Sequence, residues 1–121
     1  MSAQSLLEEA FDGQLRSSEE IPPYVRQYRF AAHLGRRYAS DFAWPEYRLL
    51  VEIEGGTFVR GRHTTGAGFH GDCLKYNLAV RLGYQVIRGD TSMVRDGTLL
   101  ETVAAVVGAA RTRIPTAEED F

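Results

Sequence analysis

Apolar residues recur at helical spacing in three stretches of the chain. We therefore predict helices from about residue 3 to 16, from about residue 71 to 82, and from residue 98 onward. The positions that define these helices are Leu7, Phe11 and Leu15; Leu74, Leu78 and Leu82; and Leu99, Val103, Val106 and Ala110. In each helix these positions are expected to form the buried stripe.

Four further stretches are predicted to be strands, at residues 24–30, 36–42, 48–54 and 84–88. A turn at residues 44–47 joins the second and third strands, because Pro45 has a fixed φ and no N–H to donate to a ladder. The first three strands follow one another directly and are expected to be antiparallel. The predicted order is αβββαβα, which indicates an α/β fold.

The last predicted helix differs from the others in the width of its apolar band. A capping box, Thr98-Leu-Leu-Glu101, is expected to start it. The band consists of Leu99, Leu100, Val103, Ala104, Val106 and Val107. One core face of a small domain does not need so wide a band, so the pattern predicts a subunit contact and a homodimer.

Length and composition are those of an ordinary globular domain. The chain has 121 residues, 44% hydrophobic and 25% charged, which suits one domain with one core and an acidic tail at 113–121 that frays. No run is long enough to span a membrane, and we expect no signal peptide. The single Cys73 excludes an internal disulfide and favours a reducing, cytoplasmic location.

Charge is distributed unevenly along the chain. The net charge of −2 argues against a nucleic-acid partner at first, but residues 24–95 hold ten Arg and one Lys against six acids, a local charge of +5. Both ends are acidic. A basic middle segment is the pattern expected of a protein that contacts phosphates locally.

Two carboxylates stand side by side on the third predicted strand. Glu52 and Glu54 share one face, because strand side chains alternate with period two. Adjacent like charges on an otherwise apolar strand repel each other and lose water. A hard divalent cation such as Mg²⁺, for which Mn²⁺ can substitute, removes this conflict by binding the carboxylate oxygens. Asp41, near the neighbouring strand, can supply a third oxygen donor.

The spacing of these acids resembles a known family. Asp41, then ten residues, then Glu52-Ile-Glu54 and two glycines is similar to the metal-binding core of the PD-(D/E)XK nuclease superfamily. The likeness extends through residues 72–77 and 82–88 and is greatest to small endonucleases related to very-short-patch repair enzymes. It implies a restriction-endonuclease-like αβββαβ core with a mixed central sheet and a C-terminal helix. The family's third motif residue is usually Lys, where this chain has Glu54.

The resemblance implies roles for individual residues. Asp41, Glu52 and the backbone carbonyl of Ile53 would hold one or two Mg²⁺ ions, and Glu54 would be a further ligand or the base. The first helix of the superfamily can add a carboxylate, here Glu8; alternatively Glu8 is a solvated acid near a helix N-terminus.

Lys75 is a candidate replacement for the missing motif lysine. It is the only lysine in the sequence, and an ammonium near the metal-bound carboxylates would orient the water or stabilise charge on phosphorus. Alternatively, Lys75 is a solvated helix residue or a partner of Asp72 at i+3.

Residues 55–71 contain six Gly and no periodic pattern, which predicts a long loop. Such a loop is functional or a plain surface connection. The DNA-binding candidates there and on the second predicted strand are Arg36, Arg37, Arg60, Arg62, His63, Thr64 and Thr65. His63 or His70 would protonate a leaving oxygen or bind a metal, or do neither.

These observations predict a Mg²⁺-dependent endodeoxyribonuclease. No sequence-reading module is recognisable, and small archaeal-type Holliday junction resolvases share this size, so a structure-selective, junction-resolving enzyme acting on branched or distorted DNA as a homodimer is favoured. The alternatives are a mismatch-nicking repair endonuclease, a DNA-binding subunit whose site has decayed, and a metal protein unrelated to nucleic acid.

Overall fold

The computed structural model describes residues 2–55 and 66–113. Ten elements follow one another along this part of the chain. In order they are α1 (Ala3–Ser17), β1 (Val25–Tyr28), the 3₁₀ helix η1 (Ala32–Leu34), β2 (Ser40–Trp44), the 3₁₀ helix η2 (Pro45–Tyr47), β3 (Leu49–Ile53), α2 (Gly66–Arg81), β4 (Gln85–Gly89), α3 (Thr91–Asp96) and α4 (Thr98–Arg113).

The four strands form one mixed sheet in the order β1-β2-β3-β4. β1 pairs with β2 and β2 with β3 in antiparallel fashion, whereas β3 and β4 are parallel. The crossover from β3 to β4 contains α2, as a parallel connection requires. The predicted α/β class and mixed sheet are therefore confirmed.

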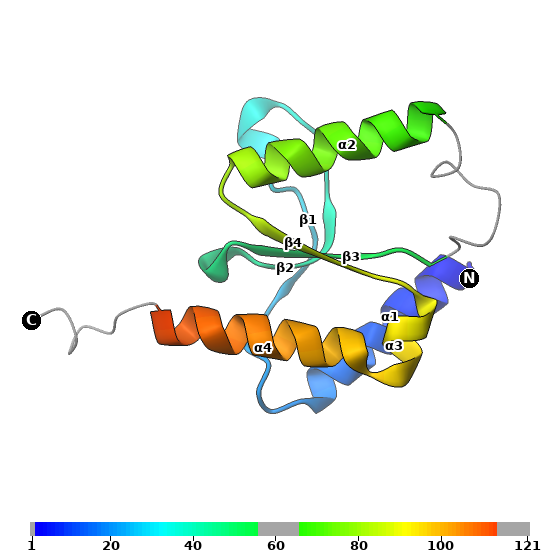
Figure 1. Cartoon of the computed structure of the whole chain (residues 1–121), viewed down its shortest axis with the longest axis vertical. Helices are drawn as coiled ribbons and strands as arrows, with labels where there is room; N and C mark the ends of the chain where they lie inside the picture. Colours follow the sequence, from blue (N-terminus) through cyan, green and yellow to red (C-terminus); the bar gives the residue numbers. More distant parts are fainter. Residues whose placement is uncertain (1, 56–65, 114–121) are drawn as a thin grey trace, which may run out of the picture.

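Helices cover both faces of the sheet (Figure 1), with α2 on one side and α1, α3 and α4 on the other. Strand alternation sends side chains to two separate cores. Phe42, Trp44 and Val51 enter the core beneath α1, α3 and α4, and Ala43 and Leu50 enter the core beneath α2. By the same alternation, Asp41 and Glu52 lie on the face that α2 covers.

The first three strands are shorter than predicted, the second is displaced along the chain, and β4 has the predicted length but begins one residue later. β2 spans Ser40–Trp44, not residues 36–42, so Trp44 belongs to the strand and the turn is the 3₁₀ helix η2. The reason is the pairing of Trp44 with Leu49, which places both residues beside the turn. Trp44 is 1% exposed, and this burial holds it in the strand.

Helix α2 begins at Gly66, so the predicted loop at 55–71 is wrong over its last six residues. The predicted stripe is wrong at Leu74, which is 49% exposed, while Leu78 and Leu82 are partly buried. Asp72 and Ala79 are the buried residues of this helix. The helix is rotated so that Asp72 and Lys75 face the sheet. The spacing of its apolar residues alone does not predict this orientation.

Helix α3 was not predicted, although its two ends carry recognisable signals. Asp90 caps it, accepting a 3.0 Å hydrogen bond from the N–H of Met93, and Gly97 ends it with φ of 85°. The expected capping box of α4 is also wrong. The Thr98 hydroxyl donates to Asp96 Oδ1, and the N–H of Glu101 donates to the Gly97 carbonyl.

The wide apolar band of α4 is used inside the molecule. Leu99, Val103 and Val107 are at most 1% exposed, and Leu100 and Val106 pack against the same core. Within the described residues, α4 has none of the large exposed hydrophobic side chains. The reason for expecting a subunit contact is therefore wrong, because α1, α3 and the sheet together cover the band. A contact through this helix stays a prediction without that support.

Val103→Glu is expected to unfold the protein. Val103 is fully buried, and an unpaired carboxylate there costs more than about 4 kcal/mol, a large part of a small domain's stability. Circular dichroism and urea denaturation measure the effect. Ala105→Glu, on the exposed side of the same helix, is the control and should leave the fold intact. If the wild-type protein is a dimer and Val103→Glu is a folded monomer, α4 forms a subunit interface after all.

No helix within residues 2–55 and 66–113 combines the length and the apolar character needed to cross a membrane.

Candidate functional site

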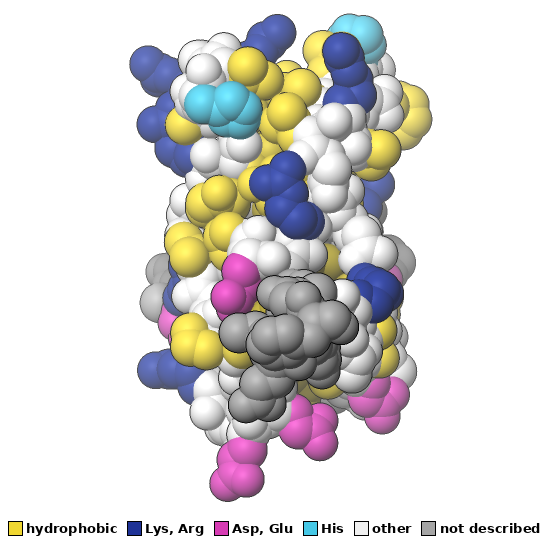
Figure 2. Space-filling view, turned by 90° about the vertical axis from the view of Figure 1, so that its left-hand side faces the viewer, with side chains coloured by type: hydrophobic (Ala, Val, Ile, Leu, Met, Phe, Trp, Pro, Cys, Tyr) yellow, Lys and Arg dark blue, Asp and Glu magenta, His cyan; other side chains and the backbone are white. Residues whose placement is uncertain are grey.

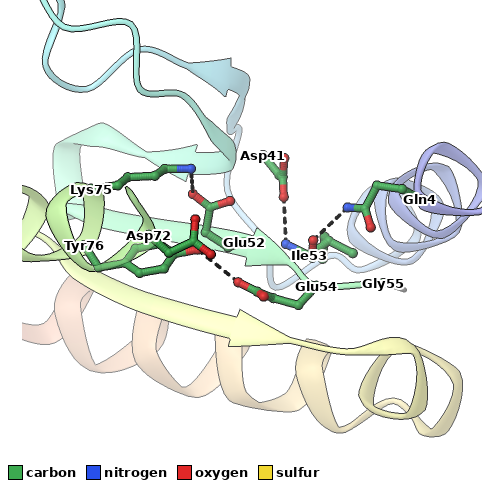
Figure 3. A pocket seen from close by; sticks show the side chains of 9 residues that line it. All are labelled: Gln4, Asp41, Glu52, Ile53, Glu54, Gly55, Asp72, Lys75 and Tyr76. Atoms are coloured by element: carbon green, nitrogen blue, oxygen red, sulfur yellow. Dashed lines mark hydrogen bonds and ion pairs between the residues drawn. The ribbon is translucent and has the colours of Figure 1, made fainter. Parts of the chain in front are cut away.

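A cavity of about 320 Å³ opens where the sheet meets α1 and α2 (Figure 3). β2 contributes Asp41, the last two residues of β3 and the two that follow them contribute a run of four, α2 contributes three side chains, and α1 contributes Gln4. The lining residues are Gln4, Asp41, Glu52, Ile53, Glu54, Gly55, Asp72, Lys75 and Tyr76. Four predicted catalytic residues, Asp41, Glu52, Glu54 and Lys75, are therefore brought to one hollow.

Strand register brings Asp41 and Glu52 together. Phe42 pairs with Val51 and Ala43 with Leu50, so one step further the antiparallel ladder sets Asp41 opposite Glu52. Side chains opposite one another on the same face of an antiparallel pair lie close together. Two carboxylates separated by ten residues in sequence are thus cross-strand neighbours.

Asp41 is held by the backbone of the neighbouring strand. Its Oδ2 accepts a 2.7 Å hydrogen bond from the N–H of Ile53. The carbonyl of Ile53, which we expected to face a metal, accepts a 2.7 Å hydrogen bond from Gln4 Nε2. Gln4 therefore places an amide donor in the position where the sequence predicted a cation.

Lys75 reaches the site from α2. Its Nζ lies 2.6 Å from Glu52 Oε1 and donates a 2.8 Å hydrogen bond to the carbonyl of Ala39. The distance between Lys75 Nζ and Glu52 Oε1 makes this contact an ion pair. Within the described residues, however, no donor has hydrogen-bond geometry toward the buried Glu52 Oε1. The Lys75 side chain is only 15% exposed, which contradicts the interpretation of a solvated helix lysine.

Burial raises the pKa of Glu52 to about 7, and the nearby Asp41 carboxylate adds to this effect, while Lys75 opposes it. A carboxyl that shares its surroundings with another carboxylate resists ionisation. Near neutral pH this site therefore holds a carboxyl that is only partly ionised, beside a second acid and one ammonium. A further positive charge in the cavity would favour the ionised form.

Glu54 faces a different set of partners. Its Oε1 accepts 2.9 Å hydrogen bonds from the Tyr76 hydroxyl and from Arg88 Nε, and the Arg88 guanidinium lies 4.5 Å from the centre of the Tyr76 ring. Burial, with the charges of Glu52 and Glu54, raises the pKa of Tyr76. Glu54 is thus anchored to α2 and β4 at one side of the cavity.

Glu8 lies beside Asp41 but does not line the cavity. Its two oxygens accept hydrogen bonds from Gln27 Nε2 at 3.2 Å and from Gln4 Nε2 at 3.4 Å. Burial raises the pKa of Glu8, and the neighbouring Asp41 charge contributes in the same direction. Glu8 is therefore a neighbour of the acidic pair from the first helix.

The remaining predicted residues fall in two groups. Arg36 and Arg37 are exposed on the segment before β2. Arg36 and Arg81 together line a separate hollow of about 220 Å³ beside α2. The other DNA-binding candidates, Arg60, Arg62, His63, Thr64 and Thr65, lie outside the described residues; His70 is exposed on α2.

Sequence reasoning gave no role at this site to Gln4, Gln27, Tyr76 or Arg88. It associated Asp72 only with Lys75, whereas Asp72 is 6% exposed and lines the cavity itself. A signal for Asp72 was present in its spacing: an acid three residues before Lys75 shares that helix face. The glutamines carry no comparable signal, because, apart from the contact of Gln4 with Glu8 on the same helix, their contacts span 14 to 49 residues of sequence.

Across residues 2–55 and 66–113, no three His, Cys, Asp or Glu side chains gather closely enough to hold a metal by themselves. The oxygens at the cavity include the acidic side chains of Asp41, Glu52, Glu54 and Asp72 and the carbonyl of Ile53. This mixed set is chemically suited to a hard cation, which takes carboxylate, carbonyl and water oxygens together.

Comparison of the chain with protein-family models, with curated proteins and with solved structures gave no significant match.

Proposed function

We propose that this protein is a Mg²⁺-dependent DNA endonuclease with a restriction-endonuclease-like core. The supporting observation is the cavity in which Asp41 and Glu52 are cross-strand neighbours and Lys75 lies 2.6 Å from Glu52. The element order α1-β1-β2-β3-α2-β4 agrees with the αβββαβ core that the sequence resemblance implies.

Mg²⁺ fits the donor set, and Mn²⁺ would fit as well. Asp41, Glu52 and the Ile53 carbonyl would hold the ion, and its charge would offset the repulsion that helps to raise the pKa of Glu52. When bound, such an ion supplies a water of lowered pKa and neutralises charge on the phosphate. The Ile53 carbonyl already accepts a hydrogen bond from Gln4 Nε2, so its second lone pair would serve the ion.

The chain's own residues have separate tasks in this mechanism. Lys75 brings a positive charge to the acidic pair, where it would stabilise negative charge developing on the phosphate. Lys75, on α2, would provide the ammonium group that the family's motif lysine usually provides at the position of Glu54. Glu54, tied to Tyr76 and Arg88, is better placed to orient α2 and β4 beside the cavity than to move freely as a base.

The DNA would approach across the part of the molecule that carries α2 and η1. Figure 2 shows most of the Lys, Arg and His side chains of the visible face in the half that holds these elements, and most of its Asp and Glu side chains in the other half. The hollow shared by Arg36 and Arg81 lies beside α2, the helix that also carries Lys75. Arginine pairs there would contact phosphates on either side of the cut.

We propose a structure-selective enzyme that acts as a homodimer, similar to a Holliday junction resolvase. The apolar band of α4 is buried, so we expect the contact to use another apolar surface, and α2 exposes Phe69, Leu74 and Val80 at 65%, 49% and 64%. Two copies related by a two-fold axis would hold two cavities at a fixed separation, as paired cuts require.

Incubation with a panel of end-labelled DNA substrates tests the function. Linear, nicked, mismatched, flapped and four-way DNA are each incubated with Mg²⁺ or Mn²⁺, with EDTA as control. We expect paired cuts in the four-way substrate. Single nicks at a mismatch would select the repair endonuclease, and binding without cleavage the decayed subunit. No salt-dependent DNA affinity would overturn the proposal, because phosphate contacts release counterions.

A further inference from the structure

A second hollow, of about 310 Å³, lies beside the acidic cavity and shares Glu54, Asp72 and Tyr76 with it. We call it the side hollow. Further lining residues are Phe69, Cys73 and Asn77 on α2 and Arg88 on β4. Its volume is at the small end of the range of ligand pockets, which suits a group the size of one nucleobase. A group bound there would lie directly beside whatever occupies the acidic cavity.

The Arg88 guanidinium is fixed at the side hollow by two contacts. Its Nε donates a 2.9 Å hydrogen bond to Glu54 Oε1, and its central carbon lies 4.5 Å from the centre of the Tyr76 ring. Within the described residues, Nη1 and Nη2 of Arg88 make no hydrogen bond, and the side chain is 50% exposed. A guanidinium held in this way offers a planar surface on which a nucleobase stacks, with N–H groups beside it.

Phe69 presents an aromatic ring to the same hollow. It is 65% exposed, and it shares one side of α2 with Cys73 and Tyr76, which follow it at helical spacing. An aromatic ring in water is a stacking platform for any base, because every base has a π-face. The amide of Asn77 both donates and accepts hydrogen bonds, so it can meet the edges of different bases.

The charges of the side hollow favour a base over a phosphate. Two carboxylates, Glu54 and Asp72, line it beside the single guanidinium of Arg88. Carboxylates repel the charged oxygens of a phosphate, whereas a neutral base with amino donors is not repelled. The hollow that Arg36 and Arg81 line has the opposite character, since no acid is among its described lining residues. That hollow suits a phosphate, and the side hollow suits a base.

We propose that the side hollow binds an unpaired nucleobase of the DNA, next to the phosphate that is held at the acidic cavity. This inference rests on the proposed function, because it concerns the same DNA. Phe69 and Arg88 would stack on the base, and Asn77 would contact its edge. Stacking depends little on the identity of the base, so the hollow selects DNA for an exposed base and not for a sequence. Mismatched or already unpaired bases leave the duplex at the least cost.

The affinity for two bulged duplexes, measured by fluorescence anisotropy in EDTA, tests this role without cleavage. One duplex carries a single unpaired nucleotide, and the other carries an abasic sugar at the same position, so that only the base differs. We expect the wild-type protein to bind the duplex with the base at least about fivefold more tightly, the lower end of the scale for stacking one base. Equal affinities would overturn the inference.

Phe69→Ala is expected to remove this preference. Its affinity for the duplex with the base should fall at least about fivefold, while its affinity for the abasic duplex stays the same. Phe69→Trp keeps a stacking ring and should keep the preference. Val80→Ala is the matched control, because Val80 is 64% exposed on the same helix but does not line the side hollow, so the ratio of the two affinities should not change.

An equal loss of both affinities in Phe69→Ala would overturn the stacking role of Phe69. Its melting temperature should match the wild type, because the ring is mostly exposed. Arg88→Lys keeps the positive charge but loses the planar group, so it should lose the preference and keep its affinity for the abasic duplex. An equal loss of both affinities in Arg88→Lys would make Arg88 a phosphate contact and overturn its part in the side hollow.

Cleavage by the wild-type protein in Mg²⁺ separates failure of this inference from failure of the proposed function. If it cuts DNA but binds both bulged duplexes equally, the side hollow holds no base and the nuclease site stands. If it prefers the duplex with the base but cuts no DNA in Mg²⁺ or Mn²⁺, the base site stands and the nuclease function is wrong. If it binds neither duplex, both proposals are wrong.

Discussion

Asp41→Asn and Glu52→Gln are each expected to abolish metal-dependent cleavage while DNA binding persists. Each replacement keeps the shape of the side chain and removes the negative charge that a divalent ion requires. Asp41 and Glu52 are cross-strand neighbours at the cavity, so neither has a substitute on the same pair of strands. Cleavage of labelled DNA in Mg²⁺, beside a binding assay in Ca²⁺ or EDTA, measures both effects.

Glu52→Gln should also stabilise the metal-free protein at alkaline pH. Burial raises the pKa of Glu52 from 4.5 to about 7, so the folded protein favours the neutral carboxyl. The stability associated with protonation is complete below pH 4.5 and is lost as the pH rises to about 7. Glutamine is neutral throughout and should gain up to about 3 kcal/mol over wild type at pH 8.

Urea denaturation in EDTA at pH 8 and at pH 5 measures this gain, which should fall to about 1 kcal/mol or less at pH 5 as wild-type Glu52 takes up its proton. Glu46→Gln, at an exposed acid on η2, is the control and should change neither cleavage nor this pH dependence. Near wild-type cleavage by Asp41→Asn or Glu52→Gln would show that the proposed metal site is wrong.

Lys75→Met is expected to lower the cleavage rate by roughly 10² or more while the fold survives, the scale of losing one transition-state stabiliser. The side chain is largely enclosed between Glu52 and the Ala39 carbonyl, so the ammonium has a defined position. Lys75→Arg should restore little, because a planar guanidinium cannot reproduce a compact point charge in that space.

Loss of Lys75 also removes the charge that lowers the pKa of Glu52, so metal binding could weaken as a secondary effect. Rates are therefore compared at saturating Mn²⁺ and across pH 7 to 9. If saturating metal or a higher pH fully restores the rate, Lys75 acts only by lowering the pKa of Glu52. If the loss of rate persists, Lys75 acts in the chemical step. Arg95→Met, exposed on α3, should cut normally.

Several features of the site were predictable from local sequence alone. Strand alternation is a property of the backbone, so it already placed Glu52 and Glu54 on one face and separated them from Val51 and Ile53. Apolar spacing identified α1 and α4, because these helices bury a continuous stripe. The order of helices and strands, and hence the α/β class, followed from the same two periods.

The tertiary structure decided which predicted faces meet. The wide band of α4 looked like a subunit contact, but α1, α3 and the sheet together cover it, and no local pattern reports how many neighbours a helix has. Helix α2 carries weak amphipathic spacing, so its rotation followed the burial of Asp72 and Ala79 and not the leucines. That rotation is what points Lys75 at Glu52.

Contacts between segments far apart along the chain could not be predicted from the sequence. The sequence by itself determined the acids, their spacing and the face of the strand on which they lie. Only the packed sheet decided that Asp41 stands opposite Glu52, that the chain's one lysine arrives from 23 residues later, and that Gln4 and Gln27 join α1 to the strands. The reason is physical: side-chain direction is set by local backbone geometry, whereas the neighbour it finds is set by register and packing across the whole domain.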